Sequence, residues 1–136
     1  MSDVFADTFY FVALVNRKGL EVRRRAIEAT VQRTGRLITT AWVLTELANT
    51  LSGLRNRNVF LETLTAIEGD PGAVIVLPDP QLFRQGIEFY RARPDKEWSL
   101  TDCISFIVME REGIQDALTG DHHFEQAGFR ALLKEK

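Results

Sequence analysis

Residues 73–93 read AVIVLPDPQLFRQGIEFYRAR, and this stretch decides the fold class. It begins with AVIVL at 73–77, which is apolar throughout, as in a strand of a parallel sheet that is covered on both faces. Pro78 ends this strand, because proline has no N–H to donate to a neighbouring strand. A helix is predicted over 79–93, with Pro80 in its first turn, where a missing N–H is tolerated.

The same alternation of strands and helices runs through the rest of the chain. Further strands are predicted at 3–6, 37–40 and 115–119, and further helices at 8–16, 19–33, 41–54, 58–69, 99–113 and 122–128, with a last strand or turn at 129–133. No repeat, low-complexity segment or linker interrupts the pattern. We therefore expect one domain over residues 1–136, with an α/β fold around a mostly parallel sheet.

The bulk composition is globular, with 45% apolar and 26% charged residues in a chain of 136. No apolar run approaches the roughly 20 residues that a membrane span needs, and the N-terminal segment has no basic start that would indicate a signal peptide. The single cysteine, Cys103, excludes an internal disulfide, and we expect a reducing cytoplasm. It is flanked by Asp102 and Ile104, and packing is a simpler role for it than nucleophilic chemistry.

The net charge of −2 argues against a protein that coats nucleic acid through its overall charge. An enzyme that cuts nucleic acid can still be acidic if a local basic patch guides its substrate. Basic residues gather at Arg17, Lys18, Arg23, Arg24, Arg25, Arg55 and Arg57. They form either such a patch or an ordinary solvated helix face.

Two aspartates follow predicted strands directly. Asp7 comes after VFA, and Asp121 comes after DALT with Gly120 between them. In parallel sheets the ligand lies beyond the carboxyl ends of the strands, so these two side chains are expected at the same edge.

Two further acidic residues belong to predicted helices. Glu46 lies in the helix after strand 37–40, at the border of its apolar stripe of Val43, Leu44, Leu47, Leu51 and Leu54. Asp102 is the only charged residue from Ser99 to Met109, in a helix that is apolar nearly all round. A buried lone carboxylate is costly unless it is paired, hydrogen-bonded or bound to a metal.

Helix capping is the alternative for three of these residues. Ser99 and Asp102 have the spacing of a capping box, and Asp7 and Asp121 are suited to N-cap positions. Capping does not explain Glu46 in mid-helix, nor why all four acids belong to elements that can meet at one edge of a sheet.

A shared pocket would make the four carboxylates raise one another's pKa or recruit a counter-charge. No lysine or arginine is placed among them in these four segments. A hard divalent cation is the simplest partner, and ligands that are all oxygen favour Mg²⁺ or Mn²⁺. Such sites commonly hydrolyse phosphodiesters.

The chain resembles a PIN-domain nuclease and, within that family, a VapC-like ribonuclease toxin. The resemblance covers essentially the whole sequence and rests on four segments taken in order, VFADTFYFVALVN, TAWVLTELANTL, SLTDCISFIVMEREG and ALTGDHHFEQAGF. It implies a three-layer α/β/α sandwich, an acidic quartet, bound Mg²⁺ or Mn²⁺, and metal-dependent endonuclease action on single-stranded RNA by water-mediated hydrolysis.

The resemblance also implies roles for single residues. Asp7 is the central metal ligand, Glu46 and Asp102 complete the catalytic pocket, and Asp102 and Asp121 contribute to metal binding, Asp121 directly or through water. Supporting roles fall to small polar residues beside these acids, namely Thr8, Ser99 and Thr101. Asp116 is a weaker candidate that is also explained as a strand-end residue.

Partners follow from the same resemblance: an RNA substrate, a small antitoxin whose tail crosses the active site, and a second copy in a homodimer. Helices 41–54 and 58–69 carry enough apolar side chains to cover a groove or a dimer face, although these residues also suit the core.

The adjacent histidines His122 and His123 raise the question of a zinc site. Neighbouring residues on a helix point about 100° apart, so we do not expect the two imidazoles to bind one ion together, and there is no third histidine. The resemblance fits His123 as a structural or phosphate-side residue. Of the two tryptophans, Trp42 is expected in the core and Trp98 is the better candidate for stacking on a base.

Three rival functions were weighed against the nuclease. An aspartate-dependent phosphatase typically has a second aspartate two residues after the first, where this chain has Phe9. A Mg²⁺-binding phospho-acceptor domain typically has an early acidic pair, yet Asp7 is flanked by Ala6 and Thr8. A non-catalytic interaction module would keep the fold alone, and the intact carboxylates argue against it.

Overall fold

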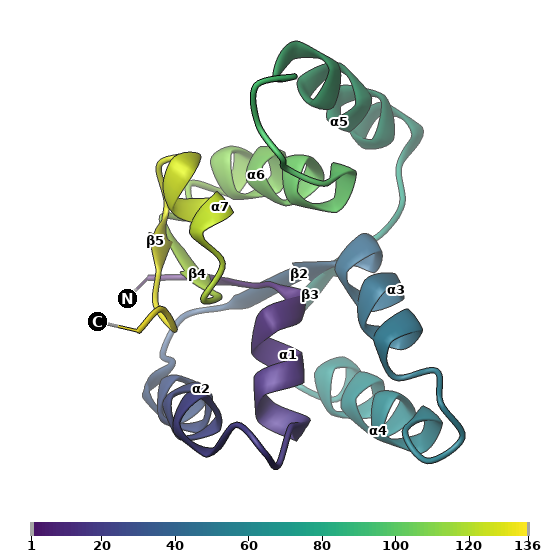
Figure 1. Ribbon diagram of the computed structural model, residues 1–136, viewed down its shortest axis with the longest axis vertical. Helices are drawn as coiled ribbons and strands as arrows, with labels where there is room; N and C mark the ends of the chain where they lie inside the picture. The colour runs from purple at the N-terminus through teal and green to yellow at the C-terminus, as the bar shows by residue number, and fades with distance from the viewer. Residues whose placement is uncertain (1, 136) are drawn as a thin grey trace.

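A five-stranded parallel sheet runs through the centre of the molecule (Figure 1). The computed structural model describes residues 2–135. The strand order is β3-β2-β1-β4-β5, and all four neighbouring pairs are parallel. The strands are β1 Val4–Ala6, β2 Leu37–Thr40, β3 Ala73–Val76, β4 Asp116–Leu118 and β5 Arg130–Ala131.

Seven helices surround the sheet within the described residues and complete the predicted three-layer α/β/α sandwich. Figure 1 shows α5, α6 and α7 on one face of the sheet and α1, α2 and α4 on the other, and α3 packs against α1 and α4. Their bounds are α1 Thr8–Val15, α2 Leu20–Gln32, α3 Ala41–Thr50, α4 Arg57–Glu68, α5 Pro80–Ala92, α6 Leu100–Glu112 and α7 His122–Gln126. No helix of this part of the chain is both long and apolar enough to cross a membrane.

The chain changes direction across the sheet at β1. From β1 it passes outward to β2 and β3, and it then returns to the other side of β1 to form β4 and β5. The carboxyl ends of β1 and β4 therefore flank the point where the strand order reverses, and ligands of open α/β sheets bind at this point.

Two predictions about burial were wrong. The strand of AVIVL is parallel as predicted, but it is the edge strand β3, its residues are only half-buried, and Leu77 is exposed. The helix predicted over 41–54 ends at Thr50, so Leu54 lies in the following turn with 95% of its surface exposed instead of on the apolar side of the helix.

An aromatic cluster fixes α6 and α7 against the sheet. The ring of Phe106 makes edge-to-face contacts with Trp98 and Phe124, with centroids 5.1 Å and 4.9 Å away. Close packing also requires a small residue before α7, because a Cβ on Gly120 would lie 2.5 Å from Cζ of Phe9. These contacts hold in place the two segments that carry Asp102 and Asp121.

Candidate active site

The structure brings the four predicted carboxylates together. Asp7, Glu46, Asp102 and Asp121 all line one cleft of about 530 Å³. Each comes from a different element: Asp7 follows β1, Glu46 lies in α3, Asp102 lies in the first turn of α6, and Asp121 precedes α7. The cleft continues along α1 past Val12 to Asn16.

Asp7 lies deepest in the cleft, and one threonine connects it to Asp121. The buried Thr119 donates from Oγ1 to Oδ2 of Asp7 over 2.8 Å and accepts from the backbone N–H of Asp121 over 3.1 Å. Sequence reasoning did not single out Thr119. Its signal was present, because it is a polar residue at the carboxyl end of β4. Asp7 occupies the N-cap position of α1 but makes no capping hydrogen bond with its side chain.

Glu46 is oriented by Thr8. The hydroxyl of Thr8 donates to Oε1 of Glu46, which joins the first turn of α1 to the middle of α3. Thr8 also lines the cleft. The structure thus gives Thr8 a contact that suits the supporting role expected from the sequence.

Asp102 is held by the capping box that its spacing from Ser99 suggested. Ser99 Oγ accepts from the Asp102 backbone N–H over 3.0 Å, and Asp102 Oδ2 accepts from the Ser99 backbone N–H over 3.3 Å. Thr101 does not line the cleft, and in the described residues its side chain makes no hydrogen bond to the carboxylates.

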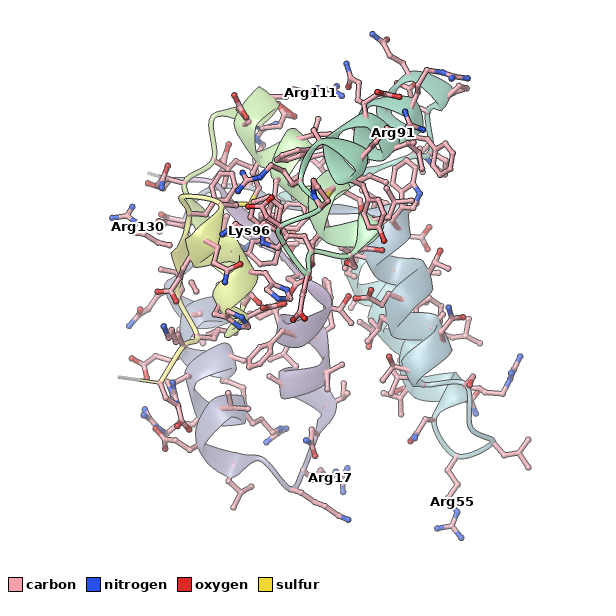
Figure 2. All side chains as sticks on the ribbon, turned by 45° about the horizontal axis from the view of Figure 1, so that its top comes forward. Arg17, Arg55, Arg91, Lys96, Arg111 and Arg130 are labelled. Carbon is pink, nitrogen blue, oxygen red and sulfur yellow. The ribbon has the colours of Figure 1, made fainter. Side chains whose placement is uncertain are left out.

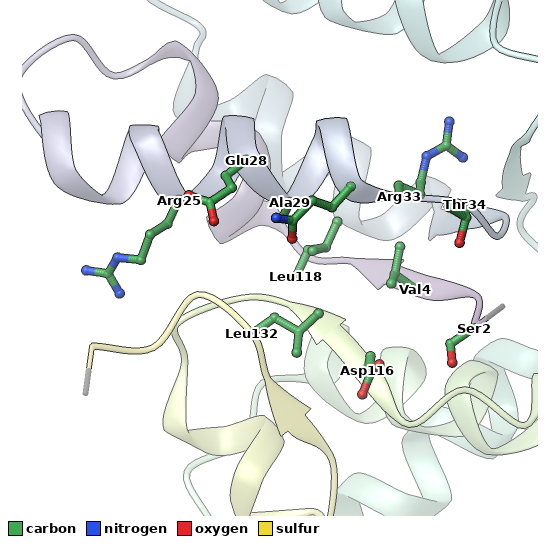
Figure 3. A pocket seen from close by; sticks show the side chains of 11 residues that line it. Ser2, Val4, Arg25, Glu28, Ala29, Arg33, Thr34, Asp116, Leu118 and Leu132 are labelled. Atoms are coloured by element: carbon green, nitrogen blue, oxygen red, sulfur yellow. The ribbon is translucent and has the colours of Figure 1, made fainter.

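Asp116 lies away from the four acids. It begins β4, whereas Asp121 follows the other end of that strand, and its Oδ1 accepts from Nε of Arg130 over 2.6 Å. It lines a second cavity of about 470 Å³, and Figure 3 shows residues of α2 such as Glu28 and Ala29 on the opposite wall. This placement matches the alternative interpretation of Asp116 as a strand-end residue.

Burial and repulsion from neighbouring acids disfavour the ionised forms of Asp7 and Asp102. Burial, followed by the charges of Asp102 and Glu46, raises the pKa of Asp7 to about 7, although the hydrogen bond from Thr119 opposes this shift. Burial and the charge of Asp121 likewise raise the pKa of Asp102. No lysine or arginine of residues 2–135 lines the cleft. Within residues 2–135, the cleft therefore offers several carboxylate oxygens as metal ligands and no lysine or arginine as a counter-charge.

The two histidines lie closer together than predicted. Their ring centroids are 4.4 Å apart, and Nδ1 of His122 and Nδ1 of His123 are 3.7 Å and 3.4 Å from Oδ1 of Asp121. Asp121 also caps α7, because its Oδ1 accepts from the His123 backbone N–H over 2.9 Å. The expectation that the imidazoles point apart was wrong, because both rings turn toward the same capping carboxylate.

Trp98 is not available for stacking on a base. It is buried between Phe89 and Phe106, and its Nε1 donates to Oε1 of Gln126 over 3.0 Å. Trp42 is half-buried against the core. Cys103 is buried, as its packing role predicts.

The basic residues do not form one continuous patch. Arg24 pairs with Glu21 and Glu28 on α2, and Arg25 donates to the carbonyl of Leu133. Figure 2 shows Arg17 and Arg55 on the separate turns that follow α1 and α3. The solvated helix face is therefore the better description of Arg24, whereas Arg17 follows Asn16 at the far end of the cleft.

The fold and the cleft together define the class of protein. The sequence profile of the PIN domain matches residues 4–130, and the chain belongs to this family. Its structure is similar to that of Mycobacterium tuberculosis VapC20, described as a Sarcin-Ricin loop cleaving toxin, with a TM-score of 0.82 and 26% sequence identity over 93% of this chain and 96% of that chain.

A second solved structure, FitAcB from Neisseria gonorrhoeae, shares the fold. It has a TM-score of 0.65 and 16% identity over 94% of this chain and 95% of that chain. No curated protein sequence gives a significant match. The resemblance to VapC-like PIN proteins that the four sequence segments indicated is thus confirmed by the family match and by the VapC20 structure.

Proposed function

We propose that this protein is a metal-dependent endoribonuclease that cleaves single-stranded RNA by hydrolysis. The observation that carries the proposal is the cleft in which Asp7, Glu46, Asp102 and Asp121 meet without a cationic side chain. Family membership supports it, as does the similarity to VapC20, which is described as a cleaving toxin.

The donor set suits a hard divalent cation. The four side chains offer only carboxylate oxygens, which favours Mg²⁺ or Mn²⁺ over softer ions. Asp7, Asp102 and Asp121 would hold the ion. When bound, it would activate a water molecule and offset the charge of the phosphate. The pKa of Asp7 is raised, so its ionised carboxylate is costly in this site, and a bound cation would stabilise it.

Residues in and beside the cleft would position these acids. Thr119 holds Asp7, Thr8 holds Glu46, and the backbone N–H of Ser99 holds Asp102. Glu46 would orient the attacking water as a hydrogen-bond acceptor. Because each carboxylate keeps at least one fixed partner, the cluster is preorganised for an in-line attack on a phosphodiester.

We further propose that the protein is one PIN domain that acts in the cytoplasm as the toxin of a toxin–antitoxin pair, inhibited by an antitoxin and assembled as a homodimer. Its similarity to the VapC20 toxin supports the proposed role as a toxin. A partner would cover two exposed apolar side chains, Leu54 in the turn before α4 and Leu61 on α4, which are exposed at 95% and 55%.

The decisive experiment is cleavage of labelled single-stranded RNA in Mn²⁺ and in EDTA by wild type, Asp102→Asn and Asp116→Asn. Asparagine at position 102 keeps an oxygen that accepts from the Ser99 N–H, so the capping box is retained. Asp116→Asn is the matched control, because it removes a carboxylate outside the cleft. We expect cleavage by wild type and Asp116→Asn in Mn²⁺ only, and none by folded Asp102→Asn. Equal cleavage by Asp102→Asn, or cleavage in EDTA, would contradict the proposal.

A further inference from the structure

Two imidazoles stand beside Asp121 at the rim of the acidic cleft. The ligand atoms of Asp121, His122 and His123 all lie within 4.8 Å of one another. The ring of His122 is exposed at 65%, whereas that of His123 is exposed at only 19% and its Nδ1 lies 3.2 Å from Oδ2 of Asp102. One ring is therefore fixed by its surroundings, and the other is free to adjust.

The spacing of these atoms fits a bound metal ion. Ligands on a tetrahedral ion with bonds of roughly 2.0–2.1 Å are about 3.4 Å apart. The separations of Asp121 Oδ1 from His123 Nδ1 and His122 Nδ1 are 3.4 Å and 3.7 Å. The exposed His122 ring is free to rotate toward the other two ligand atoms.

The chemistry of this group differs from that of the four carboxylates. Mg²⁺ takes oxygen ligands and retains its waters, whereas Zn²⁺, Co²⁺ and Ni²⁺ accept imidazole nitrogen readily. An open zinc site has three protein ligands and a water molecule in the fourth position. Here two imidazole nitrogens and one carboxylate oxygen would be the three protein ligands. Such a group favours Zn²⁺, Co²⁺ and Ni²⁺ over Mg²⁺ more strongly than the all-oxygen cluster does.

We propose that Asp121, His122 and His123 form a second metal site for an ion that prefers nitrogen ligands, with Zn²⁺ as the type case. The site shares Asp121 with the carboxylate cluster. A bound Zn²⁺ would occupy the Asp121 carboxylate, which would then no longer be available to an ion held by the carboxylate cluster. As a consequence that rests on the proposed nuclease function, Zn²⁺ would inhibit cleavage supported by Mg²⁺.

Direct binding of Zn²⁺ to the full chain tests the site without any RNA. Zn²⁺ affinity is measured by competition with a chromophoric chelator in excess Mg²⁺, and Co²⁺ is used as a spectroscopic probe of nitrogen ligation. His122→Asn is the informative variant, because this ring is exposed and its loss leaves the core intact. Glu125→Gln on the same short helix is the matched control, since its carboxylate pairs with Lys134 instead.

We expect His122→Asn to weaken Zn²⁺ binding by at least about tenfold, and Glu125→Gln to leave it unchanged. Asp7→Asn, which alters only the carboxylate cluster, should retain the wild-type affinity. Undiminished Zn²⁺ binding by His122→Asn would overturn the proposal, as would an equal loss in Asp7→Asn, because the ion would then lie among the carboxylates. If the protein binds Zn²⁺ as expected but cleaves no RNA, the proposed metal site stands and only the proposed nuclease function is contradicted.

Discussion

Replacing Asp7 by asparagine should stabilise the metal-free protein at high pH. Asp7 is buried, and its pKa is raised to about 7 by burial and by the charges of Asp102 and Glu46. Asparagine has nearly the same shape, and its carbonyl oxygen can accept the hydrogen bond that Thr119 donates. It carries no charge at any pH, so the substitution removes the repulsion and keeps the local contacts.

The raised pKa of Asp7 determines the sign of the change in unfolding free energy and the pH range in which it occurs. Between the ordinary value of 3.8 and about 7, the folded protein keeps a proton on Asp7 that the unfolded chain has lost. The free energy of unfolding of the wild type therefore falls as pH rises through this interval, and the full loss is reached above pH of about 7. Each pKa unit corresponds to about 1.4 kcal/mol, so the loss is about 4 kcal/mol at most. For a chain of 136 residues, this loss of stability corresponds to a fall in Tm of roughly 15 °C as an upper limit.

Thermal unfolding in EDTA at about pH 4 and about pH 8 measures this difference. We expect similar Tm values for wild type and Asp7→Asn at the lower pH and a higher Tm for the variant at the higher pH. Mn²⁺ should raise the Tm of the wild type and close most of the gap, because the ion binds the folded state. Asp79→Asn, at the exposed cap of α5, is the control and should show no such divergence. A lower Tm for Asp7→Asn in EDTA at about pH 8 would refute the reasoning and make Asp7 a structural group.

Three further substitutions test the contacts around the cleft. Thr8→Val removes the hydroxyl that donates a hydrogen bond to Glu46. It should slow single-turnover RNA cleavage about tenfold and change the free energy of unfolding by about 1 kcal/mol or less. An unchanged cleavage rate would show that Glu46 does not need this hydrogen bond. Gly120→Ala places a Cβ 2.5 Å from the Phe9 ring and should cost about 1–3 kcal/mol in urea unfolding, unless the ring moves without strain. Phe106→Ala should cost about 3–5 kcal/mol in the same assay, and a loss below about 1 kcal/mol would contradict its central place in the aromatic cluster.

The order of strands and helices was predictable because its signals are local. The bounds of β2 were predicted without error, and α5 begins at Pro80 after an aspartate that accepts a hydrogen bond from the Gln81 N–H. Once parallel strands are assumed, residues after their carboxyl ends must share an edge. This rule placed Asp7 and Asp121 correctly before any coordinate was known.

Burial was less predictable because it depends on distant neighbours. AVIVL has the composition of a central strand, yet within residues 2–135 no strand pairs with β3 on its outer side. Trp98 was the better candidate for stacking on a base, but the structure encloses it between Phe89 and Phe106. Thr119 could have been noticed as a polar residue directly after β4, but its hydrogen bond to Asp7, 112 positions away in the sequence, depends on how the strands pair.

The histidines show the limit of helical geometry applied to a helix end. The angle of about 100° between neighbours holds for the direction of Cβ on a regular helix. His122 and His123 occupy the first two positions of α7, where the Asp121 carboxylate caps the backbone and attracts both rings. The side-chain rotamers, and not the backbone period, bring the two nitrogens together.

Capping and ligation are compatible roles for Asp102, although the sequence presented them as alternatives. Its Oδ2 accepts from the Ser99 N–H and lies beside His123 Nδ1, while in the described residues its Oδ1 has no hydrogen bond and remains for the cleft. The capping box therefore fixes the orientation that a ligand requires. It follows that a substitution which removes the whole side chain must damage helix and site together. Only asparagine, which keeps the cap acceptor and removes the charge, separates the two roles.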